Sequence, residues 1–286
     1  MYLFMVEAPS LPVTALPVTA LPVKAPSKTV ASLAAVSKFL KHVAEEVLKD
    51  VSVPEPSSCL EWDGVDLLSE FFRERCFPSD KHPGLSNPVT LIYEPDKSKA
   101  GWFKLVDEDI VDKELLGFLE VHVDLTSPGD VVPPNVFSLI LANQVLEHVS
   151  DVRKTLSSIA NMLAPGGHLV ASTPFFAPNH GGTAPDAPDP DGRRMPGAAY
   201  EDYWRFAPQG MVRAMRDAGL EVVVLCVFHT NAALLAGAMV GVDAWYWDAD
   251  AINEGFECFE GSDEEINRAG ALWTPTVSVV ARKKTI

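Results

Sequence analysis

Residues 135–176, NVFSLILANQVLEHVSDVRKTLSSIANMLAPGGHLVASTPFF, constrain the fold of this chain more than any other stretch. The continuous apolar run VFSLILAN indicates a strand covered on both faces. An apolar face then recurs at helical spacing from Val152 onward, behind a capping Ser150 or Asp151. A Pro-Gly-Gly turn leads into a second apolar run over 168–175. Strand, helix and strand in this order predict a parallel sheet with right-handed crossovers.

The rest of the chain repeats the alternation of strand and helix. VTLIY is predicted to be the first strand, a helix is predicted within WFKLVDEDIVDKELLGF, and PQGMVRAMRDAGL is predicted to be a helix that ends at Gly219. Further strands are predicted at 120–125, 136–143, 168–175, in EVVVLCVF after Gly219, and from Thr276. The pattern predicts an α/β fold with a doubly wound, mostly parallel sheet.

Changes in composition divide the chain into three parts. Residues 1–28 contain the tandem repeat LPVTA-LPVTA-LPVKA, and proline at every fifth position favours an extended or disordered tail. Residues 29–88 are predicted to form a helical cap and a linker, and residues 89–286 the α/β domain. Within that domain, 177–200 is predicted to be a lid loop and 243–266 an acidic insertion.

The net charge of −16 limits the kinds of partner. A nucleic-acid binder needs a basic surface, and an anionic membrane repels an acidic protein, so neither partner is expected. A small-molecule substrate, neutral or basic, suits this field better. The acids of 243–266 are irregularly spaced and group with no histidine, so no metal site is predicted. The repeat tail is a candidate contact for a protein partner.

The four cysteines show no C-x-x-C spacing, so the sequence predicts neither a zinc site nor a disulfide framework. Cys226 lies in an apolar run and is interpreted as a small buried hydrophobe. No apolar run is long enough to span a bilayer, and the amino terminus has no secretory pattern. We therefore expect a soluble protein in a reducing, cytoplasmic setting, with organelle import left open.

Two motifs carry a resemblance to a known family. LEH closes the strand at 136–143 and L-x-PGG precedes the next, and residues 202–210 read DYWRFAPQG. This wording resembles class I S-adenosylmethionine-dependent methyltransferases, in the methyltransferase type 11-like branch. The resemblance implies a Rossmann-like, doubly wound, mostly parallel seven-stranded sheet with an antiparallel terminal strand. It also implies S-adenosylmethionine as cofactor and methyl transfer to a small-molecule acceptor. In such enzymes a helix like that predicted after residue 29 covers the cofactor mouth, and packing against the sheet alone is the other interpretation.

The resemblance also implies a set of cofactor-binding residues. Loops after the predicted strands supply Asn143, Gln144 and His148 near the methionine end, Asp124 with Leu125 near the adenine, and Asp109 near the ribose. For His148 a structural hydrogen bond is the alternative, and for Asp124 the alternative is capping of a turn. The family places a glycine-rich turn after its first strand, and this chain has Glu94-Pro95 after 89–93 instead. Tyr93, Glu94 and Pro95 are the candidate cofactor contacts at that place, and the missing glycines put cofactor binding in question.

Acceptor binding is predicted under the lid. His180 is the candidate general base, because a neutral imidazole can take a proton from a hydroxyl or amine. Asp202, Tyr203 and Arg205 are the candidate acceptor contacts, with Arg205 able to clamp an anionic group. Trp204 and Phe206 are predicted to lie in the core.

Two functions remain open on sequence alone. The first is S-adenosylmethionine-dependent methyl transfer to a small molecule. The second is a catalytically inactive, methyltransferase-like binding or scaffold subunit, motivated by the missing glycines and the proline-rich tail. A nicotinamide dehydrogenase is disfavoured, because its glycine-rich fingerprint is missing too.

Overall fold

The structure is a computed structural model that describes the central sheet and the helices against it. The described residues are 42, 46–48, 59–62, 89–93, 98, 100–104, 119–124, 126–127, 131–175, 203–228, 256–271, 274 and 276–285. The predicted tail at 1–28, the lid at 177–200 and most of the segment 29–58 lie outside them. In the described part, no helix is long and apolar enough to cross a membrane.

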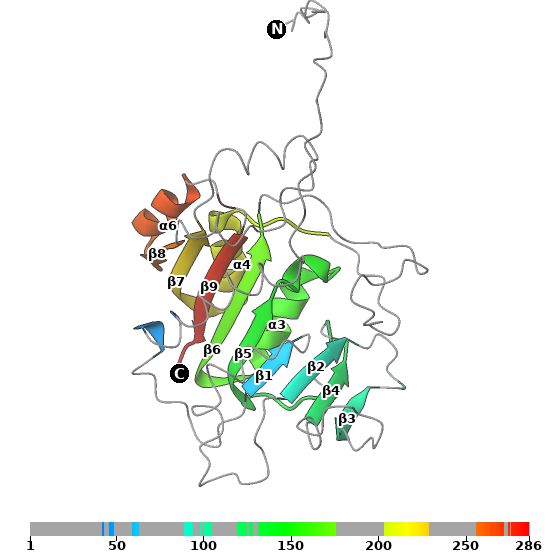
Figure 1. Cartoon of the computed structure of the whole chain (residues 1–286). Helices are drawn as coiled ribbons and strands as arrows, with labels where there is room; N and C mark the ends of the chain where they lie inside the picture. Colours follow the sequence, from blue (N-terminus) through cyan, green and yellow to red (C-terminus); the bar gives the residue numbers. More distant parts are fainter. Residues whose placement is uncertain are drawn as a thin grey trace, which may run out of the picture.

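Among the described residues, nine strands form one sheet in the order β3-β4-β2-β1-β5-β6-β9-β7-β8 (Figure 1). The strands are β1 Cys59–Trp62, β2 Val89–Tyr93, β3 Gly101–Lys104, β4 Leu119–Val123, β5 Phe137–Asn143, β6 Leu163–Pro174, β7 Leu220–Phe228, β8 Phe256–Glu260 and β9 Thr276–Lys283. β4, β2, β1, β5 and β6 are parallel to one another. β7 runs in the same direction, because β9 is antiparallel to both β6 and β7.

The predicted mixed sheet with an antiparallel terminal strand is therefore confirmed, but two details of the prediction are wrong. The described sheet has nine strands where seven were predicted, because β3 and β8 add antiparallel edges. The first strand of the sheet is β1 and not β2, and β1 lies at the centre between β2 and β5. The sheet thus begins inside the segment that was predicted to be a helical cap and linker, and the start of the predicted helix at 102–118 is strand β3.

The described helices are η4 Leu146–His148, α3 Val152–Met162, α4 Pro208–Asp217 and α6 Asp263–Gly270. Asp151 caps α3 by accepting a hydrogen bond from the Lys154 N–H at 3.1 Å, as predicted. α4 is followed by Gly219 at φ +83°, so the predicted end of this helix is confirmed. Side chains of α3 and α4 share one hydrophobic core with the sheet, so these helices cover the same face (Figure 1).

Both faces of the central strands are buried. Leu139 and Ile140 point to opposite faces of β5, and each is at most 3% exposed. Leu169 and Val170 of β6 are both fully buried in the same way. Burial on both sides explains why these strands read as continuous apolar runs rather than as alternating ones.

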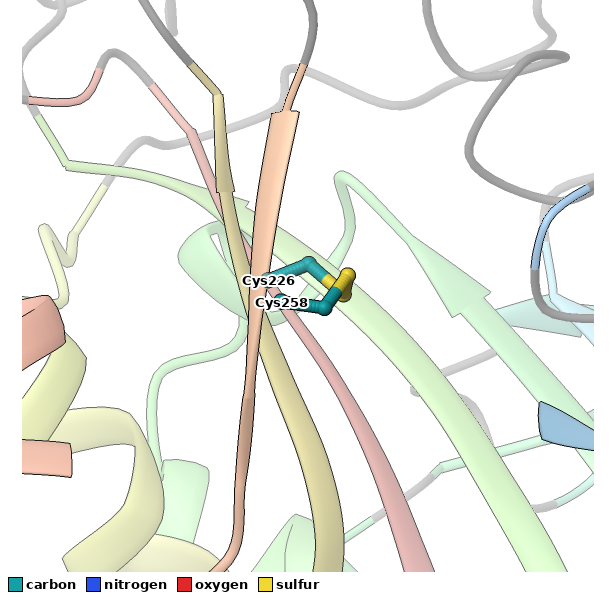
Figure 2. The surroundings of a disulfide bond; sticks show 2 residues. All are labelled: Cys226 and Cys258. Carbon is teal, nitrogen blue, oxygen red and sulfur yellow. A yellow bond between two sulfur atoms is a disulfide. The ribbon is translucent and has the colours of Figure 1, made fainter. Parts of the chain in front are cut away.

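The cysteine prediction is wrong. Cys226 of β7 and Cys258 of β8 are directly paired across the ladder and form a disulfide (Figure 2). Cys59 of β1 is disulfide-bonded as well. The absence of C-x-x-C spacing says nothing about cysteines that meet across strands, because that contact is set by register. The predicted acidic insertion at 243–266 also contains strand β8 and the first turn of α6.

Residues 46–48 lie at the amino end of β7 and not at the carboxyl ends of the strands. Val47 lines a hollow of about 920 Å³ together with the start of β7, from Leu220 to Val224, and the turn at Gly261. Leu48 is 3% exposed. Residues 46–48 therefore lie beside the start of β7, and both interpretations of the predicted amino-terminal helix stay predictions.

Candidate functional site

The strand order creates a switch point between β1 and β5. From β1 the chain builds outward to β2 and β4 on one side, and from β5 it builds to β6 on the other. Trp62, at the carboxyl end of β1, is paired with Ala142 near the carboxyl end of β5. Open parallel sheets bind ligands outside the carboxyl ends of the strands at such a point. This carboxyl edge is therefore the candidate site.

The loop after β5 is held in an unusual backbone conformation. Gln144 has φ +53°, a left-handed conformation that costs a non-glycine residue about 1 kcal/mol. Its N–H donates to the Ser172 carbonyl at 2.9 Å, and its Nε2 donates to Ser172 Oγ at 3.1 Å. Ser172 Oγ in turn donates to Asn143 Oδ1. The structure thus brings the two predicted residues together, and it adds Ser172 of β6, which no sequence motif indicated.

The DYWRF segment lies against η4. The N–H groups of Tyr203 and Trp204 both donate to the Glu147 carbonyl, at 2.8 and 3.3 Å, and Trp204 Nε1 donates to the Val149 carbonyl at 2.7 Å. Phe206 N–H donates to the Pro174 carbonyl at the end of β6 at 3.2 Å. We name residues 203–206 the aromatic segment. It lies over the carboxyl ends of β5 and β6.

The aromatic segment is only partly core, so the prediction for Trp204 is wrong. Phe206 is 8% exposed and belongs to the core, as predicted, whereas Trp204 is 39% and Tyr203 47% exposed. The backbone hydrogen bonds to η4 fix the segment at the site edge, where both side chains are exposed. Arg205 Nη1 donates to the Trp204 carbonyl at 2.8 Å, so its guanidinium also stays beside this segment.

Asp124, at the carboxyl end of β4, caps a turn. Its Oδ1 accepts the Thr126 N–H at 2.9 Å and its carboxylate accepts the Thr126 hydroxyl at 2.9 and 3.0 Å, while Ser127 Oγ approaches Oδ2 at 3.4 Å. The capping interpretation is therefore confirmed. A carboxylate has about four lone-pair sites, so these bonds leave capacity for a further donor.

Two ionisable side chains lie below the site. Glu147 of η4 is fully buried, and its Oε1 is 3.8 Å from Nε2 of the half-buried His148. His148 N–H also donates to the Val145 carbonyl at 3.1 Å. Neither of these contacts is an imidazole hydrogen bond to a neighbouring loop, so both roles of His148 stay predictions. Glu61 of β1 is 4% exposed and brings a second buried carboxyl group to the central strand, where the sequence had indicated only a linker.

Several predicted site residues cannot be placed. His180, Asp202, Glu94, Pro95, Asp109 and Leu125 lie outside the described residues, and for Tyr93 only the backbone at the end of β2 is described. Because β1 is the first strand, Tyr93-Glu94-Pro95 follows the second strand and not the first. The sequence that directly follows β1 is Asp63-Gly64, which contains a glycine and lies outside the described residues.

No group of three or more potential metal ligands occurs among the described residues. The side chains that surround the carboxyl edge there are amides, hydroxyls, a carboxylate and aromatic rings. Such a set suits an organic ligand with hydrogen-bonding groups, because it offers both donors and acceptors next to apolar surface.

Comparison with known proteins agrees with this geometry. A family described as a methyltransferase domain matches residues 41–225. Solved structures of similar shape include a methyltransferase in complex with the Haloferax volcanii Trm112 methyltransferase activator, at 16% identity and TM-score 0.42, covering 91% of this chain and 100% of that one. An S-adenosylmethionine-dependent methyltransferase of Thermotoga maritima is 14% identical, with TM-score 0.44 and coverages of 88% and 92%.

A third such enzyme, from Archaeoglobus fulgidus, is 12% identical with TM-score 0.43, covering 86% of this chain and 94% of that one. Similarities of this size do not establish the fold by themselves. No curated protein matches the sequence. The family match covers more than half of the chain and spans the switch point, η4 and the aromatic segment, and the chain therefore belongs to this methyltransferase domain family.

Proposed function

We propose that this methyltransferase transfers a methyl group from S-adenosylmethionine to a small acceptor that is neutral or basic. The observation that carries the proposal is the strained, hydrogen-bonded Gln144 loop at the switch point between β1 and β5. Strained backbone persists where the surroundings hold it, and it concentrates at ligand sites. The net charge of −16 favours an acceptor without negative charge.

The described residues fit the cofactor. Asn143 and Gln144 offer amide groups beside the methionine end, and Asp124 has acceptor capacity for the adenine amino group. Since β2 is the second strand, Glu94 replaces Asp109 as the acid that would accept from the ribose hydroxyls. When bound, S-adenosylmethionine would supply an activated methyl group on a sulfonium sulfur. Burial of both faces of β5 and β6 supports the doubly wound arrangement that such a site uses.

The chain's own contribution is to position the cofactor and the acceptor and to exclude water from the site. The Ser172 hydrogen bonds fix the Gln144 loop, so the cofactor contacts need no rearrangement when the reaction proceeds. Tyr203 and Trp204 present aromatic surface at the edge where the acceptor must enter, and they can cover it and keep the site dry. If the acceptor must lose a proton, His180 is the proposed base and Arg205 a proposed acceptor contact.

Calorimetry with S-adenosylmethionine tests cofactor binding directly. Binding at micromolar to millimolar ligand is expected. No heat of binding at millimolar ligand would reject methyl transfer and would favour the scaffold function, which nothing in the structure favours now.

A pair of variants separates the two roles of Asp124. Thr126→Val removes the hydroxyl donor and weakens the turn but keeps the carboxylate, whereas Asp124→Ala removes both the cap and the proposed adenine contact. We expect only Asp124→Ala to abolish the thermal stabilisation by S-adenosylhomocysteine. Equal stabilisation of both variants would show that Asp124 only caps the turn.

A further inference from the structure

The disulfide between Cys226 and Cys258 joins the last two strands of the sheet. The two residues are paired across the β7–β8 ladder, with Cα atoms 4.1 Å apart and a sequence separation of 32. Figure 2 shows both side chains leaving the ladder on the same face. Cys226 is fully buried, whereas Cys258 is half-buried on the edge strand. Of the two sulfur-bearing residues, Cys258 is therefore the one open to a reagent from solvent.

β8 and α6 form one unit at this edge, which we name the β8–α6 unit (residues 256–270). β8 pairs only with β7 within the described sheet. Phe259 and Ile266 bury the unit against the core, and Arg268 lies over the Phe259 ring at 5.5 Å. The remaining links run to α4: Arg216 Nη1 is 2.6 Å from Asp263 Oδ1, and Arg216 Nη2 donates to the Gly261 carbonyl at 2.9 Å.

α4 connects this unit to the candidate site. The helix begins at Pro208, two residues after the aromatic segment, and Gln209 in its first turn lies close against Gly270 of α6. Gln209 and Arg216 therefore tie both ends of α4 to the β8–α6 unit. The links therefore run from β8, which carries Cys258, through α6 to α4, and α4 begins two residues after the aromatic segment that is hydrogen-bonded to η4.

We propose that Cys226–Cys258 is a thiol–disulfide exchange site for a dithiol reductant, and that its reduction loosens the β8–α6 unit and the aromatic segment. Edge elements with few partners open at lower free energy than central strands, so a cross-link there controls how often the unit opens. Cys59 provides the contrast, because its disulfide is anchored on a fully buried strand at the centre of the sheet.

The exchange consists of two successive displacements at sulfur. A reductant thiolate bonds to Cys258 Sγ, the Sγ–Sγ bond breaks, and Cys226 Sγ leaves as a thiolate that takes a proton. The second reductant thiol loses its proton and attacks the reductant's own sulfur in the mixed disulfide, which releases the Cys258 thiolate. The dithiol is oxidised to a disulfide by two electrons, and the protein gains two thiols.

The experiment uses the full chain under native conditions with a dithiothreitol titration. Free thiols are alkylated at each step and located by peptide mass spectrometry, and hydrogen exchange is measured on the same samples. We expect Cys226 and Cys258 to be alkylated at a reductant concentration at which Cys59 stays bonded. Exchange is expected to rise about fivefold or more in 256–270 and in 203–206, with β5 unchanged as internal control.

Three outcomes would overturn the proposal. Complete alkylation of Cys226 and Cys258 without reductant would show that no disulfide is present to exchange. Reduction of both disulfides only in denaturant would show a purely structural cross-link. Unchanged exchange in 203–206 after reduction would show that the site does not respond. The variant C226A/C258A should reproduce the reduced pattern, and if it fails to fold, the reduced native chain still decides the question.

Discussion

The two edges of the sheet use polar groups in different ways. At the amino edge, Arg282 Nη2 is 2.8 Å from Glu221 Oε2, and Lys283 Nζ donates to Asn135 Oδ1 at 2.9 Å and to the Leu163 carbonyl at 2.8 Å. At the carboxyl edge, hydrogen bonds instead hold the Gln144 loop in a strained conformation and anchor the exposed Trp204 to the Val149 carbonyl. Charges at the amino edge tie strands and helix ends together, whereas the carboxyl edge holds groups ready for a ligand.

This contrast predicts where substitutions act. Changes at the amino edge should lower the free energy of unfolding and leave cofactor affinity unchanged. Changes at the carboxyl edge should lower cofactor affinity and leave the free energy of unfolding nearly unchanged.

The largest effect on stability is expected from Gly261→Ala at the end of β8. An added Cβ would lie 1.9 Å from the Val222 carbonyl oxygen, and backbone cannot move aside cheaply. We expect a loss of about 3 kcal/mol or more in urea unfolding, or failure to fold. Gly210→Ala in α4 is the matched control, because nothing lies within 4 Å of its added Cβ. Equal stability of the two variants would contradict the packing described at the amino edge.

The buried His168 should make the free energy of unfolding depend on pH, with an effect of nearly the same size. Burial, and then the charge of Arg282, lower the pKa of His168 from 6.5 to about 4. Between these values the unfolded chain binds the proton and the folded chain does not, so stability falls as the pH falls from 6.5 to 4. The loss attributable to His168 is about 3 kcal/mol at pH 4 and absent above pH 7.

The measurement is the difference in unfolding free energy between wild type and His168→Gln across that range. The variant removes this titration and leaves the carboxylates in place. A difference that does not change with pH would mean that His168 is not buried as a neutral imidazole.

A smaller loss is expected for Lys283→Met. The Nζ group satisfies carbonyls at the carboxyl end of α3, where a cation also favours the helix dipole. We expect a loss of about 1–2 kcal/mol in chemical denaturation. Lys284→Met, on the exposed neighbour, should stay within about 0.5 kcal/mol of wild type. The prediction fails if both lysine variants behave alike.

The smallest stability effect is expected at the carboxyl edge. Gln144→Gly relieves the left-handed conformation but loses the hydrogen bond to Ser172 Oγ, and each term is about 1 kcal/mol, so they nearly cancel. Affinity for S-adenosylmethionine, measured by calorimetry, should fall about tenfold, because the loop is no longer held. An unchanged affinity would remove Gln144 from the cofactor site.

Local signals explain which parts of the fold were predictable. A continuous apolar run predicts strand β5, the capping Asp151 predicts the start of helix α3, and Gly219 predicts the end of helix α4. All three predictions are confirmed. Asn143 and Gln144 were found for the same reason, because they directly follow a well-marked strand.

The parts that were missed depend on partners distant in sequence. β1 has four residues, too few for a period, and it is a strand only because β2 and β5 pair with it. The Cys226–Cys258 bond depends on the register of β7 and β8. The large apolar side chain of Trp204 is typical of a core residue. Its exposure follows from a hydrogen bond to Glu147 of η4, which is distant in sequence.

The position of β9 has a consequence for how the protein folds during synthesis. β9 lies between β6 and β7, so within the described sheet β7 and β8 have no strand pairing with the central strands until residues 276–283 have been made. Contacts such as Lys283 with Leu163 span 120 residues, and closing such long loops slows folding. A ribosome that pauses before β9 would therefore display the open edge of β6, a hydrophobic strand that chaperones or other chains could bind.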